Sequence, residues 1–226
     1  MTRWATGWAT RLVPIFATML MLVGARAYVA SREAARPLPV LGNLPSFRLT
    51  DQEGRAYGSD DLDGKVWVAS FIFTRCATVC PLLVERVRDV ERFLASHPAL
   101  DARTRLVSVS VDPKGDTPER LGAFARERHI DGARWRLLTG PAESLEDVVV
   151  GGFKLAVGEP VADVAAGKFE ILHSSRLVLV DGRRRIRGYY EGEAAGVERL
   201  ERDLLRLVAQ EPAATAPAPV AARGGE

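Results

Sequence analysis

The feature that most constrains the fold of this chain is an alternation of apolar runs with amphipathic helical patterns. Lys65–Phe73, "KVWVASFIF", is rich in β-branched and aromatic residues, which is typical of a buried strand. In Pro81–Ser96, apolar residues recur at helical spacing, and the opening proline suits a first helical turn. Thr104–Asp112, "TRLVSVSVD", has the composition of a second strand. Strand, helix and strand in this order predict a unit with parallel strands.

The second half of the chain continues this alternation. Thr117, followed by Pro118, predicts the N-cap of another helix. A strand, a helix, a β-hairpin and a last helix are then expected over Arg134–Gly140, Glu143–Gly152, Arg176–Tyr190 and Gly196–Gln210. These elements predict an α/β fold in which helices flank a central mixed sheet with a late β-hairpin.

The N-terminus has the layout of an export segment. Arg3 and Arg11 precede the uncharged apolar run Leu12–Ala25, and "ARA" at Ala25–Ala27 resembles a signal cleavage site. Residues 1–30 are therefore predicted to be a signal peptide or an N-terminal membrane anchor. Either would place the rest of the chain on the periplasmic side of the inner membrane, because the positive charges come before the apolar run.

The remaining chain is predicted to hold one domain. Residues 31–43 are expected to be a linker, 44–210 the domain, and 211–226 a disordered tail rich in Ala and Pro. A net charge of +2, with both signs interspersed, gives no basic face for nucleic acid. The basic run "DGRRRIRG" at Asp181–Gly188 is interpreted as a solvated hairpin tip.

The two cysteines of the chain, Cys76 and Cys80, lie where the first long strand passes to its helix. A disulfide between them would close a very small loop, so a purely structural role is a poor explanation. Catalytic and ligating groups gather at the carboxyl ends of strands, and a helix N-terminus favours thiolate. Thiolate serves both disulfide exchange and Cu(I) binding, so a redox dithiol and a copper site both remain open, beside a pair of small buried hydrophobes.

One of the three histidines is a candidate third ligand. His97 and His129 lie at predicted helix exits and are interpreted as structural. His173 comes just before an apolar strand and after the Gly- and Ala-containing segment Gly158–Lys168, which is expected to be irregular. Two thiolates and one imidazole suit copper in either oxidation state.

The sequence resembles the Sco/SenC family of copper-binding, thioredoxin-fold proteins from about Phe47 to Leu207. The resemblance is carried by "FTRCATVCP", "VSVSVDPKGDTPERLGAFA" and "HSSRLVLVDGRRRIRGYY". These match C-x-x-x-C before Pro, then V-D-P-x-x-D-T-P, then a His beside the strand of a late hairpin. Many members have Pro after the first cysteine, where this chain has Ala77.

This resemblance implies a copper site formed by Cys76, Cys80 and His173, on a thioredoxin-like fold. It also implies a metallochaperone that assembles the binuclear copper A centre of cytochrome c oxidase. Its partner would be subunit II of the oxidase or another copper-site protein. Asp112 and Asp116 match family positions. We interpret Asp116 first as a cap of the next helix, and alternatively as a carboxylate that supports the site or a docking surface.

Two alternatives use the same cysteines. In a thiol-disulfide oxidoreductase, Cys76 would attack a partner disulfide and Cys80 would resolve the mixed disulfide, so that a thiol reductant is a further expected partner. A peroxiredoxin-like peroxidase is the third hypothesis, because Thr74 precedes Cys76 by two residues.

Overall fold

The computed structural model describes residues 16–26, 28, 36–75, 79–163, 168–173 and 175–211, with side chains described outside 76–81 and 159–174. The chain divides into two compact units, Met1–Pro37 and Leu38–Glu226. In the first unit, residues 16–26 are helical. No helix within the described ranges is both long enough and apolar enough to cross a bilayer. The predicted tail beyond residue 211 lies outside the described residues.

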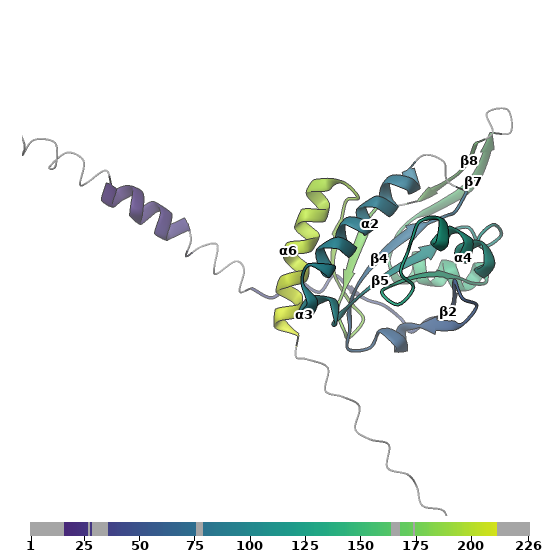
Figure 1. Ribbon diagram of the computed structural model, residues 1–226, viewed down its shortest axis with the longest axis horizontal. Coiled ribbons are helices and arrows are strands. Elements are labelled where there is room, and N and C mark those ends of the chain that lie inside the picture. The colour runs from purple at the N-terminus through teal and green to yellow at the C-terminus, as the bar shows by residue number, and fades with distance from the viewer. Residues whose placement is uncertain are drawn as a thin grey trace, which may run out of the picture. The chain divides into compact units, whose positions relative to one another are not determined.

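The second unit is built on an eight-stranded mixed sheet in the order β1-β10-β9-β4-β5-β6-β2-β3 (Figure 1). The strands of this sheet are β1 (Gly42–Asn43), β2 (Arg48–Asp51), β3 (Ala56–Gly58), β4 (Val66–Ile72), β5 (Thr104–Ser110), β6 (Trp135–Thr139), β9 (Leu177–Val180) and β10 (Arg185–Tyr190). β4, β5 and β6 pair in parallel, and the other neighbours are antiparallel. The predicted parallel units, central mixed sheet and late hairpin are confirmed.

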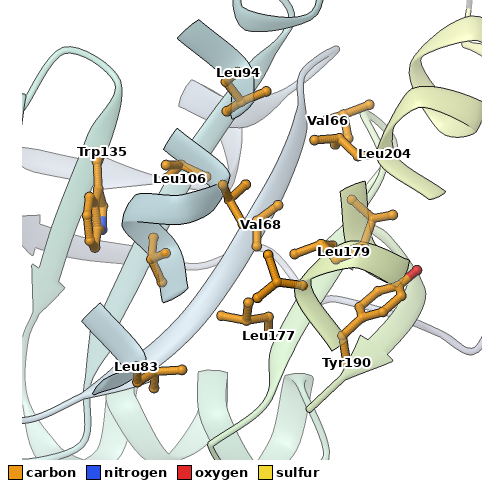
Figure 2. Packing of buried hydrophobic residues seen from close by; sticks show 14 of the residues in the cluster. Val66, Val68, Leu83, Leu94, Leu106, Trp135, Leu177, Leu179, Tyr190 and Leu204 are labelled. Carbon is orange, nitrogen blue, oxygen red and sulfur yellow. The ribbon is translucent and has the colours of Figure 1, made fainter. Parts of the chain in front are cut away.

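Strand β4 is buried along its whole length because helices cover both faces of the sheet. Its side chains alternate between two apolar clusters. Val66 and Val68, labelled in Figure 2, and Ile72 join the cluster under the helices α2 (Val79–Ala95), α4 (Pro118–Glu127) and α6 (Ala194–Gln210). Trp67 and Phe71 join the cluster under α5 (Ala142–Glu146) and η2 (Asp147–Gly152). The uniform apolar run of the sequence reflects this burial on both faces.

The helices follow the predicted order. They are η1 (Ser59–Leu62), α2 (Val79–Ala95), α3 (Pro98–Asp101), α4 (Pro118–Glu127), α5 (Ala142–Glu146), η2 (Asp147–Gly152) and α6 (Ala194–Gln210). Figure 1 shows α2 and α6 together over the sheet, and these two helices pack against each other. The single helix expected over residues 143–152 is instead the α-helix α5 continued by the π-helical turn η2.

The compact unit begins at Leu38, earlier than the predicted start of the domain at residue 44, so residues 38–43 of the predicted linker belong to it. The Leu38 side chain is buried in the core, and β1 pairs with β10. Arg187 holds this segment, since its guanidinium donates to the carbonyl oxygens of Leu38 and Pro39 and pairs with Asp181 at 2.8 Å. Arg187 is only 6% exposed, so the prediction of a solvated basic tip is wrong for this residue.

Most of the segment before His173 is regular, which corrects the expectation of an irregular Gly158–Lys168 for residues 158–163 and 168; residues 164–167 lie outside the described residues. Strands β7 (Val157–Asp163) and β8 (Lys168–His173) form a separate antiparallel ribbon that projects from the sheet (Figure 1). Its register shifts between Val157 and Pro160. Proline weakens a strand pattern in sequence, but a two-stranded ribbon tolerates it because each strand is an edge.

Candidate metal centre

The predicted ligands belong to segments that meet one edge of the sheet. β4 ends at Ile72, and the chain then passes to α2, where Cys80 occupies the first turn. Cys76 lies outside the described residues. His173 is the last residue of β8, shortly before β9. Because β9 runs antiparallel to β4, the chain enters β9 at the edge where β4 ends. The backbone thus brings Cys80 and His173 to the same edge; the side chains of these two residues are not described.

The Asp116 carboxylate accepts several hydrogen bonds at this edge. It is fully buried, and its Oδ1 accepts hydrogen bonds from the Thr74 backbone N–H at 3.1 Å and the Thr74 hydroxyl at 2.6 Å. Its Oδ2 accepts from the Ser110 hydroxyl at 2.6 Å. Burial raises the pKa of Asp116, and the hydrogen bonds from Ser110 and Thr74 oppose that rise. The carboxylate therefore ties the loop after β5 to the residues that precede Cys76.

The preferred interpretation of Asp116 as a helix cap is wrong. Thr117 caps α4, because its side chain accepts the Arg120 backbone N–H at 3.3 Å. Arg120 also donates through Nε to the Thr74 hydroxyl at 3.1 Å. Thr74, the residue on which the peroxidase hypothesis depended, thus has its hydroxyl engaged by Asp116 and Arg120.

Asp112 holds the residue next to the first cysteine. Its Oδ2 accepts from Arg75 Nε at 2.9 Å and Nη2 at 2.7 Å, and its Oδ1 accepts from the Gly115 N–H at 3.0 Å. A Cβ at Gly115 would collide with Asp112 Oδ2 and would lie 2.6 Å from Arg75 Nε. Only glycine leaves room for this pair.

A cavity of about 330 Å³ adjoins the same edge. Asp112 lines this cavity, and so does Val157, which pairs in register with His173. The further lining is mostly apolar and comes from the loop after β5, from α5 and η2 and from the start of β7: Val111, Pro113, Lys114, Ala142, Leu145, Glu146, Val149, Val150 and Gly158. The cavity thus links the neighbours of the cysteine segment with the neighbours of His173.

Within the described ranges, other metal-ligating side chains give no rival centre. Among the side chains that the structure describes, no three His, Cys, Asp or Glu residues gather as a metal site would. His97 lies just beyond the end of α2, where its ring packs tilted against that of Phe93 with centroids 4.4 Å apart and its Nδ1 lies 2.8 Å from the Phe93 carbonyl oxygen. His129 follows α4 with φ of 51°. Both therefore lie at helix exits, as predicted.

Comparison with known proteins agrees with this architecture. Residues 42–209 match the SCO1/SenC family. The SCO1 protein homolog of Bacillus subtilis is 30% identical over 155 residues, which are 68% of this chain and 76% of that protein.

Solved structures agree as well. The SCO1/SenC family lipoprotein from Bacillus anthracis is 34% identical with a TM-score of 0.65, covering 75% of this chain and 96% of that chain. BsSco, described as a Sco family cytochrome c oxidase assembly protein with a disulfide switch, is 26% identical with a TM-score of 0.66, covering 77% and 99%. Copper-bound ScoI of Bradyrhizobium japonicum is 23% identical and shares the fold, with a TM-score of 0.61 over 73% and 99%. The chain belongs to the SCO1/SenC family and has its thioredoxin-like fold.

Proposed function

We propose that this protein binds copper through Cys76, Cys80 and His173 and delivers it during assembly of the copper A centre of cytochrome c oxidase. The observation that supports this proposal is that α2 begins and β8 ends at the same edge of the sheet, in a chain of this family. Two soft thiolates and an imidazole suit Cu(I) and Cu(II). Subunit II of the oxidase, or another protein with a copper site, is the proposed recipient.

Anaerobic copper titration of the reduced chain tests this proposal. We expect one copper ion per chain, loss of binding after oxidation of the two cysteines, and at least about 100-fold weaker Cu(II) binding in His173→Ala, because even changes around a ligand cost 10- to 100-fold. His97→Ala is the matched control, since His97 lies beyond the far end of α2. Equal Cu(II) affinities of wild type and His173→Ala would refute the three-ligand site.

Thiol-disulfide exchange is a second candidate function, favoured by the position of Cys80 in the first turn of α2 and by the disulfide switch described for BsSco. The Cys76 thiolate would attack a partner disulfide and release one partner thiolate. Cys80 would then attack Cys76, release the second partner thiolate and leave a Cys76–Cys80 disulfide. A Cys80→Ser variant should trap the mixed disulfide with a copper-site protein. Tight copper binding by the wild type, together with no trapped partner in the variant, would count against this activity.

Export of the chain is part of the proposal. The N-terminal apolar run and the lipoprotein relative from Bacillus anthracis both support it. Cell fractionation and the intact mass of the mature chain would distinguish a cleaved signal from a retained anchor. Recovery of the protein in the cytoplasm would refute export.

A further inference from the structure

The parallel pairing of β4 and β5 brings two loops together. Ile72 pairs with Ser110 at the ends of these strands, and the Val111 N–H continues the ladder to the Ile72 carbonyl oxygen at 2.9 Å. Thr74 follows β4, and Asp116 lies in the loop that follows β5. Residues separated by 42 positions in sequence therefore face each other across one strand gap.

The hydrogen bonds show what Asp116 does in this loop. A hydroxyl has one hydrogen to donate. The Thr74 and Ser110 hydroxyls each also accept a hydrogen bond, from Arg120 Nε and the Asp112 N–H respectively, which leaves both hydroxyl hydrogens for Asp116. Together with the Thr74 N–H, the buried carboxylate thus receives three donors. An Asn side chain at position 116 would turn its NH2 group toward one of these three donors, and a donor cannot accept that hydrogen bond.

We infer that Asp116 is a positioning residue of the copper site, because it fixes the backbone at Thr74 and thereby holds Cys76 within reach of Cys80. The Arg75–Asp112 pair attaches the same segment a second time. The loop after β5 thus holds Thr74 and Arg75, the two residues directly before Cys76. The effect on copper rests on the proposed function. The effect on the two thiols does not, because a disulfide also requires that the two sulfurs meet.

The test compares Asp116→Asn with Asp181→Asn in the full-length chain. Asp181 is a suitable control because it too is a fully buried carboxylate that accepts backbone N–H and side-chain donors. It follows β9 at the opposite edge of the sheet, since Val180 pairs with Trp67 near the start of β4. Asp116→Asn should weaken Cu(I) binding, measured by competition with a chromogenic chelator, about 10- to 100-fold. Asp181→Asn should stay within about twofold of wild type, as expected for a residue outside the site.

The second readout uses metal-free protein in glutathione buffer. Two protein thiols reduce glutathione disulfide to two glutathione thiols and form the protein disulfide. We expect the equilibrium constant for this oxidation to fall about 10-fold in Asp116→Asn, because a looser segment lowers the effective concentration of one thiol at the other. Absence of copper binding by the wild type would refute the proposed function, and this readout would still decide the role of Asp116.

Thr74→Val keeps the inference testable if Asp116→Asn does not fold. This change removes one hydroxyl from the carboxylate at nearly constant volume, and both readouts should fall in the same direction. Thr104→Val is its control, because the buried Thr104 hydroxyl donates to the Leu100 carbonyl oxygen at 2.9 Å at the other end of β5. Wild-type copper affinity and wild-type thiol oxidation in the folded position-74 or position-116 variant would overturn the inference.

Discussion

Gly115→Ala should destabilise the protein by displacing Arg75 from Asp112. A Cβ at this position would lie 2.6 Å and 2.8 Å from Arg75 Nε and Nη2 and would collide with Asp112 Oδ2. The buried Asp112 side chain has to turn its Oδ2 away from the new methyl group, and Arg75, which has the more exposed side chain, 37% against 4%, is expected to move into solvent. A buried carboxylate then loses its cation.

The net cost follows from two opposing terms. A hydrogen bond to a charged group contributes about 1.5–3 kcal/mol, and solvent exposure of Arg75 reduces the loss to about 1.5 kcal/mol. Gly115 is not among the described glycines with positive φ, so alanine fits its backbone and restores about 0.5 kcal/mol by restricting the unfolded chain. We therefore expect a net loss of about 1 kcal/mol. With a slope of about 2 kcal/mol per M, the urea midpoint should fall by about 0.5 M.

A double-mutant cycle in urea checks the reasoning. In an Arg75→Ala background the pair is already absent, so Gly115→Ala should cost less than half as much as in the wild type. The slope of the unfolding transition should stay the same in all four proteins. An equal cost of Gly115→Ala in both backgrounds would refute the argument that glycine makes room for the pair.

Three further predictions concern buried residues outside the proposed copper site: Asp181, Arg187 and Phe153. Burial opposes ionisation of Asp181, but hydrogen bonds from the Arg185 N–H and the Arg187 guanidinium outweigh it and lower its pKa below the ordinary 3.8. The stability that ionised Asp181 contributes is therefore present above pH 3.8 and lost as pH falls through the lowered pKa. Below about pH 4, the urea midpoint of Asp181→Asn should therefore fall less than that of the wild type. Arg187→Leu should cost about 3–5 kcal/mol, because it leaves a buried carboxylate with fewer donors, and the amide of Leu41 should exchange faster by mass spectrometry. Phe153→Ala should cost about 3–5 kcal/mol in thermal unfolding, because the ring is fully buried with its centroid 5.0 Å from that of Phe71; a loss below about 1 kcal/mol would contradict the packing described.

The sheet was largely predictable because its strands and helices have strong local patterns. Burial on both faces makes β4 apolar except for Ser70 and gives β5 its apolar residues Leu106, Val107 and Val109, and α2 repeats apolar residues at helical spacing. The ribbon β7–β8 has no such pattern, since its strands pair mainly with each other and include Gly158 and Pro160. The start of the compact unit was missed for a related reason. Leu38 stands between Pro37 and Pro39, where no strand or helix pattern marks it, and the hydrogen bond that holds its backbone comes from Arg187, far along the chain.

The candidate ligands are recognisable in sequence because each belongs to a compact motif, whereas their support depends on strand register. The pattern Asp116-Thr117-Pro118 offers two candidate caps for one helix. Thr117 stands directly before the proline at the first helical turn, which is the position of an N-cap, and its hydroxyl fills that role. Asp116 is then one residue too early to cap α4 and must satisfy a buried charge elsewhere. The parallel register of β4 and β5 supplies the partner, because it puts the first turn after β4 beside the loop after β5. The assignment of the N-cap to Thr117 already left Asp116 without a place at the start of α4, but the partner of Asp116 depends on the strand register, which makes Thr74 the residue it holds.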